Sequence, residues 1–375
     1  MNAAGSGEVD ARAWAQALGI SVEAVELYLA SEVIDLHIDS FIWTRMFGYD
    51  VRRRHGRGLF NGRFYSQVDL PRLRQAHVGG AMWSITTNPF RSAGGRASTF
   101  AANLAELRGI FDSVPEQACV VRDHAEYGAA RARGQHAVLL AIQGGNALDR
   151  DLAALDELGD AVLRVTLLHL TKSRLGRSST PQPSAAEAGL SEQGRAYVAE
   201  LNARRVFVDL AHIGRRSFFD AVEQHDSSQP LLVTHTGVKA VWPSWRNIDD
   251  EQLRAVAATG GVVGVIYNGG YLSGHYLSGG RAADIARHLE HIVTCVGPDV
   301  PALGSDWDGF IIPPADMRTC LELPRLVQAL LDRKFDIDVI QNILGRNFLR
   351  AFSRLRPGRS ARDRANLQLE SPTQK

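Results

Sequence analysis

The chain has 375 residues, of which 45% are hydrophobic and 22% are charged, and its formal net charge is +1. This composition is typical of a globular protein with room for one large α/β domain or two smaller ones. We expect neither nucleic acid nor a membrane as a partner, because the chain has no excess of positive charge and no run of about 18 apolar residues.

The N-terminal residues predict a helical segment followed by a strand. Apolar side chains recur at helical spacing over residues 11–30, and we expect 1–30 to form a helical extension ahead of the main domain. Residues 32–39 alternate as a strand does and end in His37 and Asp39. Side chains two positions apart share one face of a strand. An imidazole nitrogen and a carboxylate oxygen at one point are ligands that suit zinc and similar metals.

The next segment, 41–67, is long and contains the basic run 52–57. This run is predicted to be a solvated loop, and the alternative is a role in attracting an anionic substrate. Asp69 then has the position of an N-terminal cap for a short helix, with Pro71 in its first turn.

From residue 78 onward, strand-like runs alternate with helical segments, and no internal repeat is visible. This alternation predicts a parallel sheet. The segment 172–188, rich in Ser, Pro, Gly and Arg, is predicted to be a loop over the site. The expected strands are 78–85, 137–142, 162–168, 205–212, 231–235, 261–267 and 300–305, and the expected helices include 100–111, 149–158, 191–203, 249–259, 282–296, 322–333 and 339–352.

With the first strand, the strand-like runs number eight, which favours an α/β fold of the closed (β/α)8 TIM-barrel type over residues 31–355. The alternative is an open, doubly wound sheet, but no Gly-rich phosphate-binding turn follows the first strand. Residues 356–375 are polar and are expected to form a disordered tail.

The three cysteines, Cys119, Cys295 and Cys320, are an odd number and are widely spaced, unlike a disulfide framework or a thiolate metal site. The first residues show no basic region followed by an apolar core, so no secretory signal is apparent. We therefore expect a reduced, cytoplasmic protein.

Potential metal ligands stand at or just beyond the ends of several predicted strands. In a parallel barrel these C-terminal ends form one rim, where reactive groups gather. Each residue could singly be structural, and the nearby Asp209 and Asp308 could be hydrogen-bond acceptors or helix caps. Three imidazoles and two carboxylates on one rim nevertheless predict a metal-binding site. The residues are His37, Asp39, His212, His235 and Asp306, and His169 stands at a further strand end.

The motifs along the chain resemble those of the membrane dipeptidase (renal dipeptidase, peptidase M19) family, within the wider amidohydrolase-like barrels. They occur in the family's order over about 33–352, nearly the whole chain, and the family's soluble bacterial members lack a membrane anchor. The matching segments are 35–39 (DLHID), 166–169 (TLLH), 208–212 (VDLAH), 234–235 (TH), 245–247 (WRN), 264–265 (GV), 304–309 (GSDWDG) and 344–349 (LGRNFL).

The resemblance implies a hydrolase that cleaves the amide bond of dipeptides with a water activated by two divalent ions, usually zinc. Such chemistry needs no covalent nucleophile, because the cations lower the pKa of a water and neutralise the developing oxyanion. By resemblance, one ion is held by His37, Asp39 and Asp306 and the other by His212 and His235.

The resemblance also implies roles around the substrate. Asp306 would handle the proton of the attacking water, and His169 would face the substrate and polarise the carbonyl or stabilise the tetrahedral intermediate. Arg246 would pair with the substrate carboxylate, a task that suits its planar fork of donors. Tyr271 would contact the substrate. A homodimer is expected from the family alone.

The chain departs from the family at Gln143, in the turn 142–145, where the family has a glutamate that bridges both metals. Glutamine carries no charge, and only one of its terminal atoms is a useful ligand. Two cations close together repel, so losing the bridging carboxylate weakens the pair. We expect one ion to be held well by His37, Asp39 and Asp306, and the second, at His212 and His235, weakly or not at all.

Several outcomes of this change stay open. In the first, the glutamine is tolerated and dipeptidase activity survives. In the second, dipeptidase activity is reduced. Alternatively, the chain hydrolyses a lactam or another specialised small amide, or it binds substrate through Arg246 without turnover.

Overall fold

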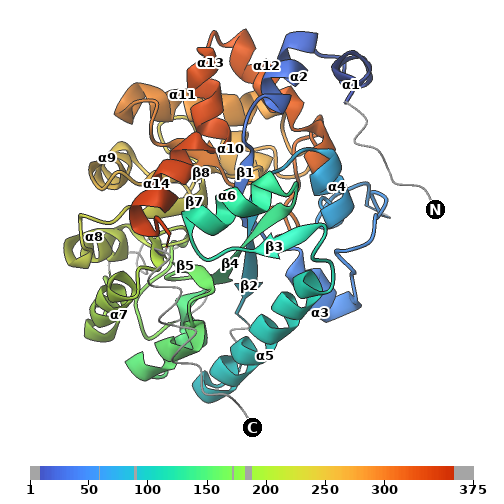
Figure 1. The fold of residues 1–375 in the computed structure, drawn as a ribbon. Coiled ribbons are helices and arrows are strands. Elements are labelled where there is room, and N and C mark those ends of the chain that lie inside the picture. Colours follow the sequence, from blue (N-terminus) through green and yellow to red (C-terminus); the bar gives the residue numbers. More distant parts are fainter. Residues whose placement is uncertain (1–8, 59, 88–90, 171–172, 182–187, 359–375) are drawn as a thin grey trace.

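The structure, a computed structural model, describes residues 9–58, 60–87, 91–170, 173–181 and 188–358. Eight parallel strands form a closed barrel with helices outside it (Figure 1), so the predicted (β/α)8 TIM barrel is confirmed. The ring closes where β2 pairs with β4. Around the barrel the strands are β1 (Ile34–Ile38), β2 (Gly80–Thr86), β4 (His136–Gln143), β5 (Val162–Thr166), β6 (Phe207–Asp209), β7 (Leu232–Thr236), β8 (Val262–Val265) and β9 (Pro301–Leu303).

A ninth strand, β3 (Ala118–Val120), pairs with the first half of β4 and was not predicted. It lies on the side of β4 that pairs with β5 further along. Three residues are too few to show a periodic pattern, and two of these three are only partly buried.

Helices and short helical turns surround the barrel and connect its strands. The helices are α1 (Ala11–Leu18), α2 (Val22–Leu29), α3 (Phe41–Phe47), α4 (Leu70–Gln75), α5 (Ala93–Asp112), α6 (His124–Ala132), α7 (Glu192–Ala203), α8 (Arg215–Gln224), α9 (Asp250–Ala258), α10 (Gly269–Ser273), α11 (Ala282–Val296), α12 (Pro324–Asp332), α13 (Ile337–Gln341) and α14 (Asn347–Leu355). Among the described residues, none of these helices is both long and apolar enough to cross a membrane.

Several helical boundaries differ from the prediction for local reasons. The helix expected over 11–30 is two helices, because Gly19 ends α1 in the left-handed region at φ 66° and Ser21 caps α2. The segment 41–67, for which no helix was predicted, begins with α3. The expected helix 149–158 is a 3-10 helix, Leu152–Leu158. The Asp69 cap is confirmed, since its carboxylate accepts a hydrogen bond from the amide of Arg72 at 2.8 Å.

The backbones of β7, β8 and the segment after β9 approach one another closely, and this approach requires glycine at positions 264 and 304. A Cβ atom on Gly264 would meet the carbonyl oxygen of Thr234 at 2.1 Å, and one on Gly304 would meet the same oxygen at 1.8 Å. Both distances are far below van der Waals contact, so any larger residue would push the strands apart. This close approach brings the ends of β7 and β9 together, where candidate ligands stand.

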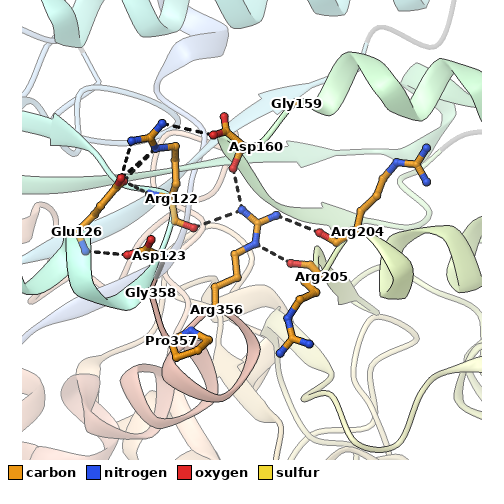
Figure 2. Close-up of a pocket in the computed structure, with 10 residues that line it drawn as sticks. All are labelled: Arg122, Asp123, Glu126, Gly159, Asp160, Arg204, Arg205, Arg356, Pro357 and Gly358. Atoms are coloured by element: carbon orange, nitrogen blue, oxygen red, sulfur yellow. Dashed lines mark hydrogen bonds and ion pairs between the residues drawn. The ribbon is translucent and has the colours of Figure 1, made fainter. Parts of the chain in front are cut away.

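A cavity of about 430 Å³ lies at the opposite, N-terminal face of the barrel (Figure 2). The guanidinium of Arg356 donates to the carbonyl oxygens of Arg205 at 2.7 Å and Asp160 at 2.8 Å. The other arginines of the cavity are also paired: Arg122 with Glu126, Arg204 with Asp156, and Arg205 with the carbonyl of Leu355. These contacts hold the C-terminal end of α14 against the N-terminal face of the barrel.

The predicted tail begins at this anchored arginine, so residues 356–358 belong to the ordered structure. The rest of the predicted tail, 359–375, lies outside the described residues. So do 171–172 and 182–187 of the loop predicted over 172–188.

Candidate metal and substrate site

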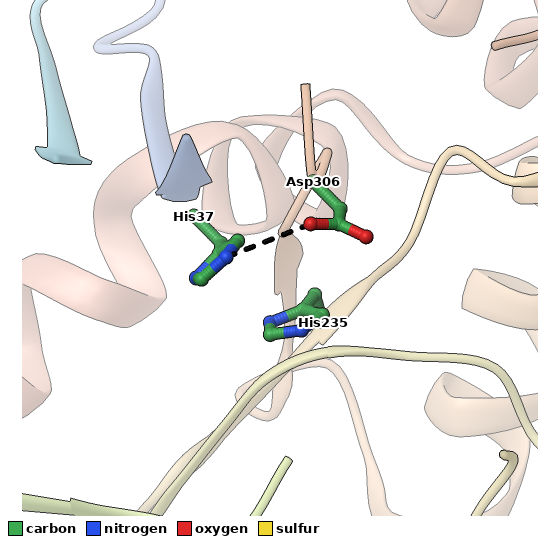
Figure 3. A group of neighbouring side chains, drawn as sticks. All are labelled: His37, His235 and Asp306. Atoms are coloured by element: carbon green, nitrogen blue, oxygen red, sulfur yellow. Dashed lines mark ion pairs between the residues drawn. The ribbon is translucent and has the colours of Figure 1, made fainter. Parts of the chain in front are cut away.

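The predicted ligands converge at the C-terminal rim of the barrel. His37 is in β1, His235 is in β7, and Asp306 follows β9. One potential ligand atom from each of these three buried residues lies within 4.8 Å of the others, and Figure 3 shows the three side chains around one point. The Nε2 atom of His37 is 3.5 Å from Asp306 Oδ1 and 3.5 Å from Asp39 Oδ2.

The remaining imidazoles adjoin this group. The Nε2 atoms of His212 and His235 are 2.7 Å apart. The ring of His235 stacks on that of His37 with centroids 3.9 Å apart, and the ring of His169 meets that of His212 edge-on at 4.5 Å. The structure therefore brings together all the histidines and carboxylates that the sequence singled out.

Two of these residues have unusual backbone conformations. His212 has φ 62° and Asp306 has φ 61°, in the left-handed region that costs a non-glycine residue roughly 1 kcal/mol or more. Hydrogen bonds hold the second of these in place: the amide of Asp306 donates to the carbonyl of His37 at 3.1 Å, and the amide of Ser305 donates to the Asp35 carboxylate at 3.0 Å. Strain of this kind is typical of functional sites, where the fold imposes a side-chain direction.

Asp209 supports the site from beneath. Its Oδ1 accepts from the amides of Ala211 and Thr234, and its Oδ2 accepts from the hydroxyls of Thr166 and Thr234. Of the alternatives left open for this residue, the structure favours a hydrogen-bond acceptor. Its partners are Thr166 in β5, Ala211 in the loop that follows β6, and Thr234 in β7. Asp209 therefore fixes the segments that carry His212 and His235.

Asp308 is likewise a buried acceptor, near the other side of the rim. Its carboxylate accepts from the Ser40 hydroxyl and from the Gln67 amide at 2.8 Å. Burial raises its pKa to about 6.

Sequence reasoning did not single out Arg164, which is fully buried inside the barrel. It forms an ion pair with Asp209 at 3.2 Å, and its Nη2 lies 2.9 Å from His37 Nδ1. The signal was present, since an arginine stands among the apolar residues Val162, Leu163 and Val165 of the fully buried strand β5. A charged residue is almost never fully buried without a specific partner.

The electrostatic environment keeps the histidines neutral. Burial lowers the pKa of His169 to about 4, and it also lowers the pKa values of His37, His212 and His235. Neutral imidazole is the form that binds a metal. Burial raises the pKa of Asp306, the nearby Asp39 carboxylate raises it further, and Arg246 opposes this shift.

Gln143, the last residue of β4, stands between the two groups of ligands. One terminal atom of its carboxamide lies 2.6 and 3.2 Å from the carboxylate oxygens of Asp39 and must be the amide nitrogen, because a carboxylate only accepts. The other atom, the oxygen, lies 3.2 Å from His37 Nε2, 3.4 Å from His212 Nε2 and 3.5 Å from His235 Nε2.

The donor set fits a divalent metal ion. Neutral imidazole nitrogens and carboxylate oxygens on one rim are ligands that zinc takes in proteins. The buried Nε2 atoms of His212 and His235 offer two nitrogens to one point, and Asp306 offers an oxygen near the second of them.

A cavity of about 990 Å³ opens from this rim and is large enough for a small-molecule substrate. Arg246 is buried in its wall, where its Nη2 donates to the carbonyl of His235 at 2.6 Å. Its Nε has no hydrogen-bond partner within the described residues. Tyr271 is partly buried on the same wall, and Asp39, Gln143, His169, His212 and Asp306 also border the cavity.

Comparison with known proteins agrees with this arrangement. The model of the membrane dipeptidase family (peptidase family M19) matches residues 22–362. A dipeptidase, aclJ, from Aspergillus oryzae is 27% identical over 331 residues, which cover 84% of this chain and 76% of that protein. An uncharacterized protein in the pqqA 5' region of Klebsiella pneumoniae is 35% identical over 164 residues, 43% of this chain. That match spans 59% of the Klebsiella protein.

Among solved structures, a metallo peptidase from Rhodobacter sphaeroides, liganded with a phosphinate mimic of the dipeptide L-Ala-D-Ala, is similar with a TM-score of 0.75 and 23% identity. The match covers 87% of this chain and 99% of that one. At this identity the likeness concerns the fold. With the family model matching nearly the whole chain, the resemblance read from the motifs is confirmed: this chain belongs to the membrane dipeptidase family, peptidase family M19.

Proposed function

We propose that the protein is a metal-dependent hydrolase that cleaves the amide bond of dipeptides or closely similar small amides. The observation that carries the proposal is the buried group of imidazoles and carboxylates at the floor of a cavity whose wall holds Arg246. Membership of peptidase family M19 and the similarity to an Aspergillus dipeptidase support the same reaction class.

The metal is proposed to be zinc, since the donor set combines imidazole and carboxylate. When bound, such an ion lowers the pKa of a water molecule and polarises the carbonyl that is attacked. The chain's own residues hold it: His212 and His235 by their Nε2 atoms, and Asp306 by a carboxylate oxygen. Asp306 is also proposed to take up the proton of the attacking water, which is the role that the family resemblance implies.

Arg246 is proposed to bind the substrate's carboxylate. Its guanidinium is buried, one of its donors lacks a partner within the described residues, and it borders the same cavity as the ligands. A planar fork of donors matches a carboxylate in geometry as well as charge. His169, neutral because of its lowered pKa, is proposed to donate to the carbonyl oxygen of the scissile amide, and Tyr271 to contact the substrate beside Arg246.

The test is hydrolysis of a panel of L,L- and L,D-dipeptides by protein loaded with zinc and by the same protein stripped with a chelator. We expect release of free amino acids only by the loaded protein. A loaded, folded protein that binds dipeptides without cleaving them would contradict the proposal.

A second candidate is binding without turnover, and Gln143 is the observation that favours it. Its amide nitrogen donates to Asp39 at 2.6 Å, so an oxygen expected to hold a metal is hydrogen-bonded instead. Isothermal titration with a dipeptide, followed by analysis of the recovered ligand, separates the two candidates. Intact dipeptide favours binding, and free amino acids favour hydrolysis. A lactam in the same titration tests the specialised-amide alternative.

We also propose a homodimer, from the family resemblance alone. From the sequence pattern we propose a cytoplasmic location and a division into an N-terminal helical extension, 1–30, and a barrel, 31–355. Cys119, Cys295 and Cys320 are all free thiols, as a reducing compartment requires. Sedimentation analysis at two protein concentrations tests the dimer.

A further inference from the structure

We propose that His37 acts in this site as a hydrogen-bond donor and not as a metal ligand, so that the chain holds a single divalent ion, on the side of His212, His235 and Asp306. The inference deepens the proposed function, and it rests on where the donors and acceptors of this chain are. Arg164 and Gln143 decide it together.

The first step concerns the Nδ1 atom of His37. Arg164 Nη2 lies 2.9 Å from it and also donates to the hydroxyl of Ser84 at 2.7 Å, while Nη1 donates to the carbonyl of Ile142 at 3.1 Å. A guanidinium has five donors and no acceptor. The contact is therefore a hydrogen bond from Arg164, and Nδ1 of His37 must present a lone pair. The single proton of this neutral imidazole is then on Nε2.

The second step follows that proton. Nε2 of His37 lies 3.2 Å from the oxygen of Gln143, so the imidazole donates to the carboxamide. The amide nitrogen of Gln143 then donates to Asp39 at 2.6 Å. Asp39 accepts a second hydrogen bond, from the hydroxyl of Thr86 at 2.8 Å. A continuous chain of donors thus runs from Arg164 through His37 and Gln143 to Asp39, and every link is satisfied without a cation.

The third step compares this arrangement with that of a metal ligand. A histidine that binds a metal uses the lone pair of one nitrogen, and its other nitrogen donates to an acceptor. His37 has the reverse arrangement, because its inner nitrogen accepts. To bind an ion through Nε2 it would have to give up its only remaining ring proton beside a buried guanidinium.

The fourth step shows that His235 has the arrangement that His37 lacks. Its Nδ1 lies 2.8 Å from the hydroxyl of Thr234, and that hydroxyl donates to Asp209 Oδ2 at 2.8 Å. With its hydrogen used in this way, the hydroxyl can only accept from Nδ1. Nε2 of His235 is left with a lone pair, 2.7 Å from Nε2 of His212. His235 therefore meets the requirement for a metal ligand, and Nδ1 of its neighbour His212 has no hydrogen-bond partner within the described residues.

The charges around the site also favour a single ion. Gln143 brings no negative charge to the position between the two groups of ligands, and the charge of the buried Arg164 is already balanced by Asp209. Without a carboxylate between them, the repulsion between two dications is not offset at this position. The inference reverses the order expected from the sequence, in which the group of His37, Asp39 and Asp306 was to be the stronger site.

The test is metal content per chain, measured by plasma mass spectrometry after loading with zinc and removal of free ion. We expect one ion in the native protein. His37→Gln should keep that ion and His235→Gln should lose it, although both remove one imidazole from the same rim. Two ions in the native protein, or loss of the ion in His37→Gln with circular dichroism unchanged, would overturn the inference.

A gain-of-site experiment identifies the cause. The double variant Gln143→Glu with Arg164→Met supplies the carboxylate and frees Nδ1 of His37, so the content should rise from one ion to two. Asp209 keeps its bonds from Thr166 and Thr234 in this variant. A content that stays at one ion would refute the role given to Arg164.

A spectroscopic readout covers the case in which a variant does not fold. In native protein labelled with 15N-histidine, two-bond correlations report which ring nitrogen bears the proton, and His37→Gln assigns the signal. We expect His37 to be protonated at Nε2 in the zinc-loaded protein, whereas protonation at Nδ1 would overturn the inference. None of these readouts requires turnover, so the inference and the proposed dipeptidase activity can fail separately.

Discussion

The Nε2 atoms of His212 and His235 lie 2.7 Å apart at the ends of the neighbouring strands β6 and β7. Two buried neutral imidazoles at this distance either share one proton or bind one cation. We therefore expect His212→Ala to weaken zinc binding by roughly 100-fold or more, at least as much as the loss of a supporting residue. Competition with a chromophoric chelator measures this affinity.

His124→Ala is the matched control for this measurement, because it removes an imidazole from the start of α6 that packs on Phe352 away from the rim. It should leave the affinity of the tight ion unchanged. An equal loss of affinity in the two variants would show that the effect is not local to the rim.

The buried guanidinium of Arg246 gives a second prediction, on substrate preference. Arg246→Ala should raise KM for dipeptides by roughly 30-fold or more, because truncating one partner of a buried charge pair costs about 2–5 kcal/mol. Dipeptide amides, which lack the carboxylate, should be cleaved with similar kcat/KM by the native and variant proteins. Steady-state assays on matched acid and amide substrates measure the difference. A loss that is the same for both substrates would contradict the role proposed for this arginine.

The cap of α4 gives a third prediction, on stability. The carboxylate of Asp69 accepts from the amides of Arg72 and His55 at 2.8 Å each, and its Oδ2 pairs with Arg72 Nε at 2.7 Å. Asp69→Ala leaves a buried guanidinium without its partner and should lower the free energy of unfolding by roughly 3–5 kcal/mol. Urea denaturation of the metal-free protein measures it.

The control for this cap is Asp151→Ala, which removes a more exposed carboxylate that accepts from the amide of Ala154 as a cap and, among the described residues, pairs only with the exposed Arg150. Its expected cost is about 1 kcal/mol. Equal costs for the two substitutions would mean that the buried ion pair of Asp69 adds nothing to its cap.

A fourth prediction concerns acid sensitivity away from the metal site. His136 is buried, and its Nε2 accepts from the indole of Trp83 at 3.1 Å, so its Nδ1 donates to the carbonyl of Val78 at 2.9 Å. Burial lowers its pKa from 6.5 to about 4. Between these two pH values the unfolded chain binds a proton that the folded chain excludes. The free energy of unfolding therefore falls as pH falls from 6.5 to 4, by roughly 3 kcal/mol for this residue.

His136→Gln tests this cause, because a glutamine can accept from Trp83 and donate to Val78 without titrating. Urea denaturation at several pH values should show a smaller loss of stability in the variant than in the native protein over this window. Parallel pH profiles for the two proteins would exclude His136 as a source of acid sensitivity.

The elements that could not be predicted from the sequence are short or have only a weak apolar pattern. The strand β3 has three residues, and α3 and α10 have seven and five, which is too little for a periodic pattern to emerge. The helix α6 also went unpredicted, although Asp123 caps it with a hydrogen bond to the amide of Glu126 at 2.8 Å. Its sequence, rich in alanine and charge, shows only a weak apolar face.

The sequence by itself determined the barrel and the rim. Strand and helix periods are local properties, and in a closed parallel barrel every residue at a strand end reaches the same rim, so His37, His212, His235 and Asp306 could be brought together without coordinates. Gln143 was likewise recognisable as a departure, because its place in the motif is local.

Only the tertiary structure decided what each ligand can do. Arg164 and His37 are 127 residues apart in the chain, and their contact is formed only when β5 faces β1 across the barrel. That contact determines which nitrogen of His37 bears the proton, as the contact of His235 with Thr234 and Asp209 does for the opposite half. Proton positions depend on the partners that surround a side chain in space, and no spacing of residues along a chain specifies those partners.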